Sequence, residues 1–130
     1  YIAGLFAIIG HVFPIYYGFK GGKGVLVGVS TFLIVDIKVF IALIAIFAVI
    51  LAITKYVSLA SIIATAYCPI ATLLMSWIVN DNGFGRSFLY MILSIPMSGI
   101  IIWMHRTNIE RLMAGTENKF SFNTVDMSEK

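Results

Sequence analysis

One stretch of the sequence, residues 56–79, contains no charged side chain over its whole length. A helix needs about 20 consecutive apolar residues to cross the hydrocarbon core of a bilayer, and this run is long enough. The rest of the chain agrees, because 60% of its 130 residues are hydrophobic and only 12% are charged. Soluble domains carry about 25% charged residues. The sequence therefore predicts an all-α, polytopic integral membrane protein.

Four further apolar segments accompany this one, so we expect about five transmembrane helices in the chain. They are residues 1–17, 25–35, 39–54 and 87–104. The second is short for a span and predicts a short or locally mismatched helix. Residues 36–38 and 80–83 predict the turns between neighbouring helices. Pro14 is expected to end the first helix, leaving Tyr16 and Tyr17 at interface depth, and Pro69 is expected to kink the long one.

The chain begins at Tyr1 within apolar sequence, without a methionine or a basic leader region. We therefore expect it to be a fragment that lacks its N-terminal part.

The basic residues alternate between two sides if each apolar segment crosses the membrane. One side receives seven of the nine: Lys20, Lys23, Lys55, Arg106, Arg111, Lys119 and Lys130. The positive-inside rule then predicts that this side is cytoplasmic. The net charge of +3 is small and is spread along the chain. The sequence therefore indicates no nucleic-acid partner.

The loop at residues 18–24 reads GFKGGKG and places two lysines among four glycines. Glycines let backbone N–H groups turn toward a ligand, and N–H groups beside ammonium groups suit a phosphate. The apolar segment after Gly24 predicts a helix N-terminus, whose dipole favours the same ligand. A second interpretation remains open, in which the lysines lie at the membrane surface and only set the topology.

Two other polar stretches, residues 55–61 and 105–117, reach the same predicted edge. In the second, His105, Asn108 and Arg111 follow at intervals of three and share one face of a helix. Each residue alone has a simpler explanation, such as anchoring a helix at the headgroups. Their convergence with the glycine-rich loop predicts a site for a phosphate-bearing ligand.

No pattern indicates a catalytic nucleophile, a pair of catalytic carboxylates or a metal site. His11 and His105 have no acidic ligands nearby in the sequence, so we expect neither a metal nor another cofactor. The expected chemistry is positioning and charge stabilisation of an already activated substrate.

Three strings in the sequence are GHVFPIYYGFKGGKG, KYVSLASI and HRTNIERLMAGTE. In order and spacing they resemble the motifs of the bacterial acyl-phosphate-dependent glycerol-3-phosphate acyltransferases, the PlsY family. The resemblance covers nearly the whole chain and implies a seven-helix bundle in the plasma (inner) membrane of a bacterium, with a cytoplasmic active site. Residues 1–117 would be the C-terminal part of a single transmembrane domain. Residues 118–130 would be a flexible cytoplasmic tail.

The resemblance implies transfer of a fatty acyl group from acyl phosphate to the sn-1 hydroxyl of glycerol 3-phosphate. The products would be lysophosphatidic acid and phosphate, in phospholipid synthesis at the membrane lipid surface. The implied catalytic residues are Lys23, His105 and Asn108. The implied substrate- and phosphate-binding residues are Lys20, Gly21, Gly22, Lys23, Gly24, Ser58, His105, Asn108, Arg111 and Glu117. The substrate phosphate can itself take the hydroxyl proton, which suits a site without a nucleophile.

The family's first motif, a loop containing Ser, Gly, Asn and an arginine, is absent from this sequence. We therefore expect the chain alone to be inactive and the site to be completed in the full-length gene product. Two other functions stay open. Kinks at Pro69 and Pro96 suit a membrane carrier for a phosphorylated solute, whereas cations at one edge favour an enzyme at the membrane interface. A structural membrane subunit needs no site at all.

Overall fold

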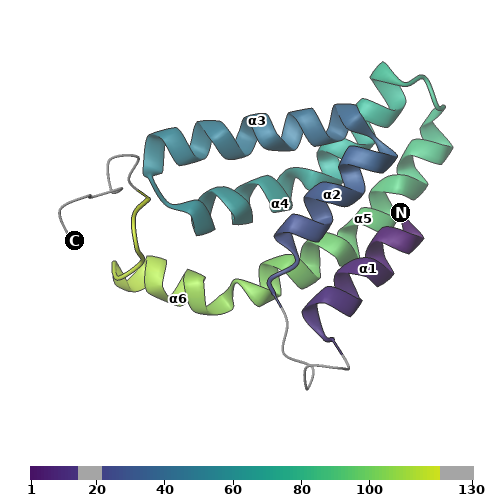
Figure 1. The fold of residues 1–130 in the computed structure, drawn as a ribbon. Helices are drawn as coiled ribbons and strands as arrows, with labels where there is room; N and C mark the ends of the chain where they lie inside the picture. Colours follow the sequence, from purple (N-terminus) through teal and green to yellow (C-terminus); the bar gives the residue numbers. More distant parts are fainter. Residues whose placement is uncertain (15–21, 121–130) are drawn as a thin grey trace, which may run out of the picture.

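The computed structural model describes residues 1–14 and 22–120, and this part of the chain folds into helices joined by short connections (Figure 1). The elements are α1 (Ile2–Val12), α2 (Val25–Val35), α3 (Ile37–Thr54), α4 (Val57–Leu74), the π-helical turn η2 (Met75–Val79), α5 (Phe84–Met104) and α6 (Arg106–Ala114). The predicted positions of Tyr16 and Tyr17 lie outside the described residues. The all-helical prediction is confirmed.

Within residues 1–14 and 22–120, three helices are long and apolar enough to cross a membrane: Ile37–Thr54, Val57–Val79, which joins α4 to η2, and Phe84–Met104. The other two apolar segments form the shorter helices α1 and α2. Eleven residues of helix rise only about 16 Å, against a hydrocarbon core of about 30 Å. The prediction of a short helix at Val25–Val35 is confirmed, and α1 ends before Pro14 as expected.

The turn between α2 and α3 is tighter than the sequence suggested, because Asp36 alone separates the two helices. Its Oδ1 accepts hydrogen bonds from the backbone N–H groups of Lys38 (3.1 Å) and Val39 (3.3 Å) and caps α3. Its Oδ2 accepts a hydrogen bond of 2.8 Å from Asn80 Nδ2. Asp36 therefore ties this turn to the loop between η2 and α5, and Lys38 belongs to the first turn of α3.

Helix α4 is central and packs against both α3 and α5 along most of its length (Figure 1). Small polar side chains are buried on α4, η2 and α5, namely Ser58, Ser61, Thr72, Ser76, Ser87, Ser94 and Ser98. Ser76 Oγ and Ser87 Oγ lie 3.0 Å apart, and Asn82 Nδ2 donates to Ser76 Oγ at 3.1 Å. In a bilayer the lipid tails are as apolar as the helices, so the hydrophobic effect does not drive the helices together. Small side chains favour helix association instead, because they let the backbones approach closely.

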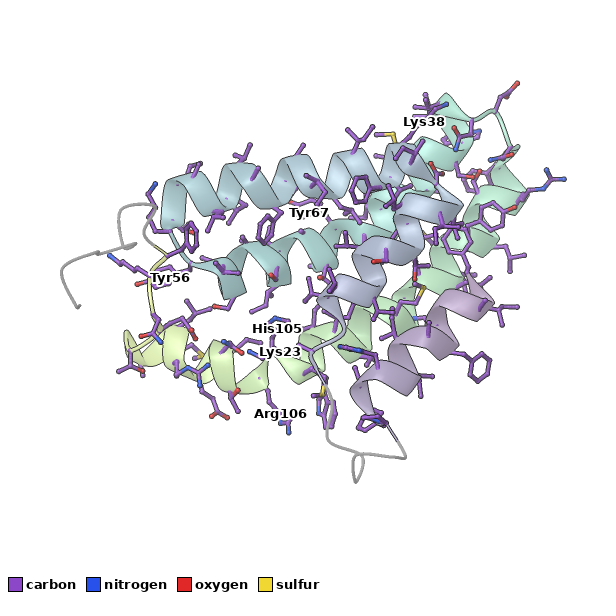
Figure 2. The ribbon with its side chains drawn as sticks, viewed as in Figure 1. Lys23, Lys38, Tyr56, Tyr67, His105 and Arg106 are labelled. Atoms are coloured by element: carbon purple, nitrogen blue, oxygen red, sulfur yellow. The ribbon has the colours of Figure 1, made fainter. Side chains whose placement is uncertain are left out.

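Helix α3 lies at the edge of the bundle, where only 6% of its residues are buried. It meets α2 at Asp36, and the two helices diverge toward the opposite end of the bundle (Figure 1). Lys38 lies at the Asp36 end, whereas Lys23, His105 and Arg106 lie toward the other (Figure 2). The predicted gathering of the loop at Lys23 with the end of α5 is therefore present.

Replacing Asp36 with alanine removes the cap of α3 and the bridge to Asn80. We expect Asp36→Ala to lower the free energy of unfolding by about 0.5–2 kcal/mol, measured by denaturant unfolding in detergent micelles. Asp36→Asn is the control, because asparagine also caps helices well. Equal stability of Asp36→Ala and the unmodified protein would contradict this role.

Candidate active site

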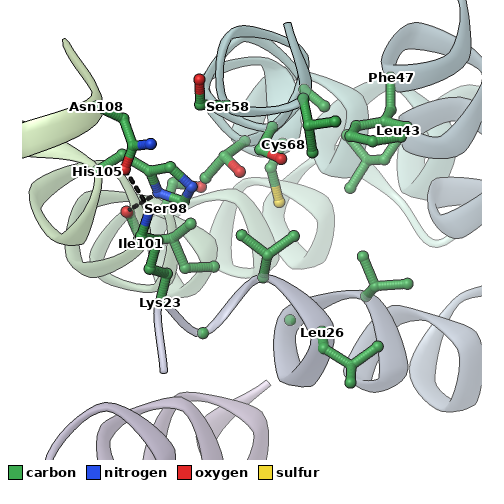
Figure 3. A pocket seen from close by; sticks show the side chains of 18 of the residues that line it. Lys23, Leu26, Leu43, Phe47, Ser58, Cys68, Ser98, Ile101, His105 and Asn108 are labelled. Carbon is green, nitrogen blue, oxygen red and sulfur yellow. Dashed lines mark hydrogen bonds between the residues drawn. The ribbon is translucent and has the colours of Figure 1, made fainter. Parts of the chain in front are cut away.

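The three polar stretches meet around one pocket of about 820 Å³ (Figure 3). Its polar mouth is lined by residues far apart in the sequence, namely Lys23, Gly24, Ser58, His105, Asn108 and Glu117. Lys23 precedes α2, Ser58 lies in the first turn of α4, and His105 lies where α5 gives way to α6. The predicted convergence of the three stretches is thus present in the structure.

A hydrogen bond from Lys23 Nζ to Asn108 Oδ1 joins the glycine-rich loop to α6. Asn108 is 5% exposed, and its Nδ2 faces the two carboxylate oxygens of Glu117 at 3.3 and 3.4 Å. Glu117 Oε2 also accepts from Arg111 Nε at 3.2 Å. An amide whose oxygen accepts from a cation and whose nitrogen donates to a carboxylate has a fixed orientation. Lys23, Asn108, Glu117 and Arg111 therefore form one connected chain of polar contacts.

His105 is 3% exposed, and its Nδ1 lies 2.8 Å from the carbonyl oxygen of Ile101. A carbonyl oxygen only accepts hydrogen bonds, so Nδ1 carries the proton of the neutral ring and Nε2 is left as an acceptor. Burial lowers the pKa of the His105 imidazole below its ordinary value, and the charge of Lys23 acts in the same direction. His105 is therefore neutral near pH 7 and presents a basic nitrogen.

Ser58 is 8% exposed, and its Oγ is buried without a hydrogen-bond partner among the described residues. A buried hydroxyl without a partner costs about 1–3 kcal/mol. Because Ser58 lines the polar mouth, a ligand with an oxygen acceptor there can satisfy it.

Glycines bring α2 against the neighbouring helices at the pocket mouth. Gly24 adopts a left-handed φ of 80° just before α2, and a Cβ there would lie 3.2 Å from Ile8 and 3.3 Å from Ile101. At Gly28, one turn later, a Cβ would lie 3.0 Å from Ile101. Helix α2 begins at Val25, as the sequence predicted, so its N-terminal N–H groups and positive dipole end adjoin Lys23.

Away from the mouth the pocket is mainly apolar, with the hydroxyl side chains of Ser61, Thr65 and Ser98 as exceptions (Figure 3). Helix α3 contributes Phe40, Leu43, Ile44 and Phe47, a spacing of three and four that places them on one helix face. Leu26 and Val29 of α2 line the same space. The pocket thus combines a polar mouth with an apolar interior, which suits an amphiphilic ligand.

The remaining predicted site residues fall into three groups. Lys20 and Gly21 lie outside the described residues. Gly22 adjoins Lys23 but contacts the His11 imidazole, because a Cβ on Gly22 would lie 2.4 Å from His11 Nε2. Arg111 does not line the pocket, and its side chain is 46% exposed beside Glu117.

Sequence reasoning did not place His11 or the residues Asn118, Lys119 and Phe120 at the pocket, although all four line it. His11 lines it from the last turn of α1, and its place in the same string as Lys23 was the available signal. Lys119 was assigned to the tail, but its Nζ lies 5.7 Å from the centre of the Tyr56 ring. The next residue, Phe120, donates its backbone N–H to the Lys55 carbonyl oxygen at 2.6 Å. The rest of the predicted tail lies outside the described residues.

Two bacterial proteins named glycerol-3-phosphate acyltransferase are similar to this chain over most of its length. The protein from Staphylococcus saprophyticus is 44% identical over 121 residues, which cover 93% of this chain and 55% of the relative. The protein from Fusobacterium nucleatum is 42% identical over 121 residues, covering 93% of this chain and 58% of the relative. The chain therefore spans a little over half the length of these relatives.

Two crystal structures of PlsY (YgiH), described as an integral membrane glycerol 3-phosphate acyltransferase, have a similar fold. The glycerol 3-phosphate form is 35% identical with a TM-score of 0.71, and the match covers 88% of this chain and 52% of that one. The lysophosphatidic acid form is 32% identical with the same TM-score, covering 88% and 54%. The family model described as glycerol-3-phosphate acyltransferase matches residues 1–115. The chain belongs to the glycerol-3-phosphate acyltransferase family.

Proposed function

We propose that this chain carries part of the active site of a membrane acyltransferase that moves a fatty acyl group from acyl phosphate to the sn-1 hydroxyl of glycerol 3-phosphate. The products are lysophosphatidic acid and inorganic phosphate. The observation that carries the proposal is the pocket itself, with Lys23, Ser58 and His105 at a polar mouth above an apolar interior. Such a pocket suits a phosphorylated head and an acyl tail at once.

In this proposal Lys23 and the N–H groups at the start of α2 hold a substrate phosphate. Ammonium groups and helix N-termini both favour phosphate oxygens, and the unpartnered Ser58 hydroxyl donates one more hydrogen bond. Lys20 and Gly21 belong to the same loop by the family resemblance. The charge that develops on the departing phosphate is stabilised by groups already in place, without a covalent intermediate.

The proposed reaction forms one bond and breaks one. The sn-1 oxygen attacks the acyl carbon, and the bond from that carbon to the phosphate oxygen breaks, so that phosphate leaves with the electron pair. Nε2 of neutral His105 accepts the hydroxyl proton, and the departing phosphate then receives it. A tautomer fixed by the Ile101 carbonyl keeps Nε2 ready for this step.

Asn108, Glu117 and Arg111 hold the site together in this proposal. Glu117 accepts from both Asn108 and Arg111, and Asn108 in turn accepts from Lys23. The carboxylate thereby offsets some of the positive charge around the mouth, while Arg111 keeps Glu117 in place. Arg111 acts through Glu117 because it does not line the pocket.

We place the pocket mouth and the C-terminal region on the cytoplasmic side of a bacterial inner membrane. Lys23 precedes α2, and Lys55 lies between α3 and α4. Arg106 and Arg111 belong to α6, and Lys119 follows it. If each apolar segment crosses the membrane, all five fall on that side. An excess of lysine and arginine marks the cytoplasmic side of short loops. Glycerol 3-phosphate, a water-soluble substrate, would reach the mouth from there.

The test of the activity uses membranes that contain the product of the complete gene, labelled glycerol 3-phosphate and either acyl phosphate or acyl-CoA. We expect labelled lysophosphatidic acid from acyl phosphate only. Lys23→Ala is expected to lower kcat/KM at least about 100-fold, because it removes a preorganised charge. Lys38→Ala, at the opposite end of the bundle, is the matched control. Folded protein without product from either donor would instead support a carrier, examined by solute uptake into vesicles.

Ser58→Ala separates ligand binding from stability. Because Ser58 Oγ has no partner among the described residues, its loss should leave the free energy of unfolding unchanged or slightly higher. The KM for one phosphate substrate should rise about tenfold, through loss of a hydrogen bond to a charged group. Steady-state kinetics with each substrate varied in turn identifies which one. A loss of stability with unchanged KM would make Ser58 a packing residue.

The neutral state of His105 predicts the acid limb of the pH profile. Protonation of Nε2 removes the acceptor, so kcat/KM should fall as the pH drops through the lowered pKa of His105 and should be constant above it. His105→Gln should lower kcat/KM about 100-fold or more and abolish this limb. A limb of the same midpoint in His105→Gln would assign it to another group, such as a substrate phosphate.

A further inference from the structure

The apolar interior of the pocket ends at a floor to which four helices each contribute one residue. Among the described residues, the lining on each helix stops at Phe32 of α2, Phe40 of α3, Cys68 of α4 and Met97 of α5. Phe32, Cys68 and Met97 are 3%, 3% and 1% exposed and belong to the main hydrophobic core, against which Phe40 packs. The pocket therefore stops where the close packing of the bundle begins.

The floor lies at the pinned end of α2 and α3. Phe32 and Phe40 stand four residues before and after Asp36, and their backbones are hydrogen-bonded to it. Since Asp36 caps α3 and accepts from Asn80, the two phenylalanines flank the point at which this helix pair is tied to the loop before α5. The floor is therefore anchored at the end of the pair where α2 and α3 meet.

The depth of the pocket follows from the rise of the helices that line it. Met97 precedes His105 by eight residues on α5, and Cys68 follows Ser58 by ten residues on α4. At 1.5 Å per residue, the floor lies about 12–15 Å from the polar mouth. The side chains between are mainly apolar, including Leu43 and Phe47 (Figure 3). The interior can therefore hold a hydrocarbon chain of limited length.

We propose that this floor, and Phe40 in particular, sets the length of acyl chain that the protein accepts. The inference rests on the proposed acyltransferase function and adds a specificity determinant to it. The phosphate end of the acyl donor is fixed at the mouth by Lys23 and Ser58, so the methyl end of the chain falls at a distance set by chain length alone. A chain that is too long meets Phe40 and the core behind it, which is packed too tightly to yield.

The test changes the floor in both directions. Phe40→Ala removes a ring that lines the pocket, whereas Leu43→Phe adds bulk three residues further along the same face of α3. Decanoyl, lauroyl and myristoyl phosphate, whose extended chains bracket the depth of the pocket, compete for the enzyme expressed from the complete gene, and the chain lengths of the lysophosphatidic acids are measured. Phe40→Ala should raise the preference for myristoyl over decanoyl about tenfold, and Leu43→Phe should lower it.

Ile41→Ala is the matched control on the same helix. Ile41 is 59% exposed and does not line the pocket, so its variant should keep the chain-length preference of the unmodified protein. If Phe40→Ala does not fold, Leu43→Phe still tests the floor.

A binding measurement keeps this inference separate from catalysis. Alkyl phosphates of the same chain lengths should raise the Tm of the purified protein, with the optimum moving to longer chains in Phe40→Ala and to shorter chains in Leu43→Phe. Absence of turnover with any acyl phosphate would count against the proposed function and leave this readout intact. Chain-length preferences that stay the same in both variants, in turnover or in binding, would overturn the floor.

Discussion

The contact between Lys23 and Asn108 is the interaction on which the rest of the site depends. It joins a loop at the start of α2 to a helix that follows α5, across most of the sequence. Several features serve this single contact. Gly24 and Gly28 let α2 approach the side chain of Ile101, and Glu117 holds the Asn108 amide in the orientation that accepts from a cation. Without that orientation, the lysine would extend into water and the mouth of the pocket would lose its shape.

Polar groups inside the bundle have two different roles. Along α4, η2 and α5, the hydroxyl groups of Thr72, Ser76, Ser87 and Ser94 are hydrogen-bonded within or between these elements and permit close helix packing. At the mouth, the Ser58 hydroxyl and Nε2 of His105 remain able to form hydrogen bonds with a ligand. The difference lies in their surroundings, since the first set is enclosed by helices and the second lines an open pocket. Chemistry is thereby confined to one edge of an otherwise tightly packed unit.

Much of the fold and part of the site could be predicted from the sequence. Uncharged runs predicted the helices, and Pro14 and the polar turn at residues 80–83 predicted where helices end. These features depend only on residues close together in the sequence, because membrane thickness sets the length of an apolar run and proline or turn residues end a helix where they stand. The motifs indicated that Lys23, Ser58 and His105 would meet. The burial of Ser58, the tautomer of His105 and the place of His11 against Gly22 depend on how helices pack, which no local pattern encodes. The turn at residues 36–38 was predicted, but its reduction to Asp36 alone was not, since the Asp36 carboxylate is fixed partly by Asn80 from a distant loop.

The divergence of α2 and α3 from a single residue has a consequence for the two unlike substrates of the proposed reaction. Both helices line the pocket, and both carry strongly exposed apolar side chains, such as Leu26 at 74% and Ile53 at 74%. With that apolar surface in the bilayer, an acyl donor of the proposed reaction would reach the pocket by diffusing in two dimensions within one leaflet. The water-soluble acceptor of the same reaction would diffuse in three dimensions through the aqueous phase. The two routes would end at the same pocket, and neither substrate would have to cross the other's solvent.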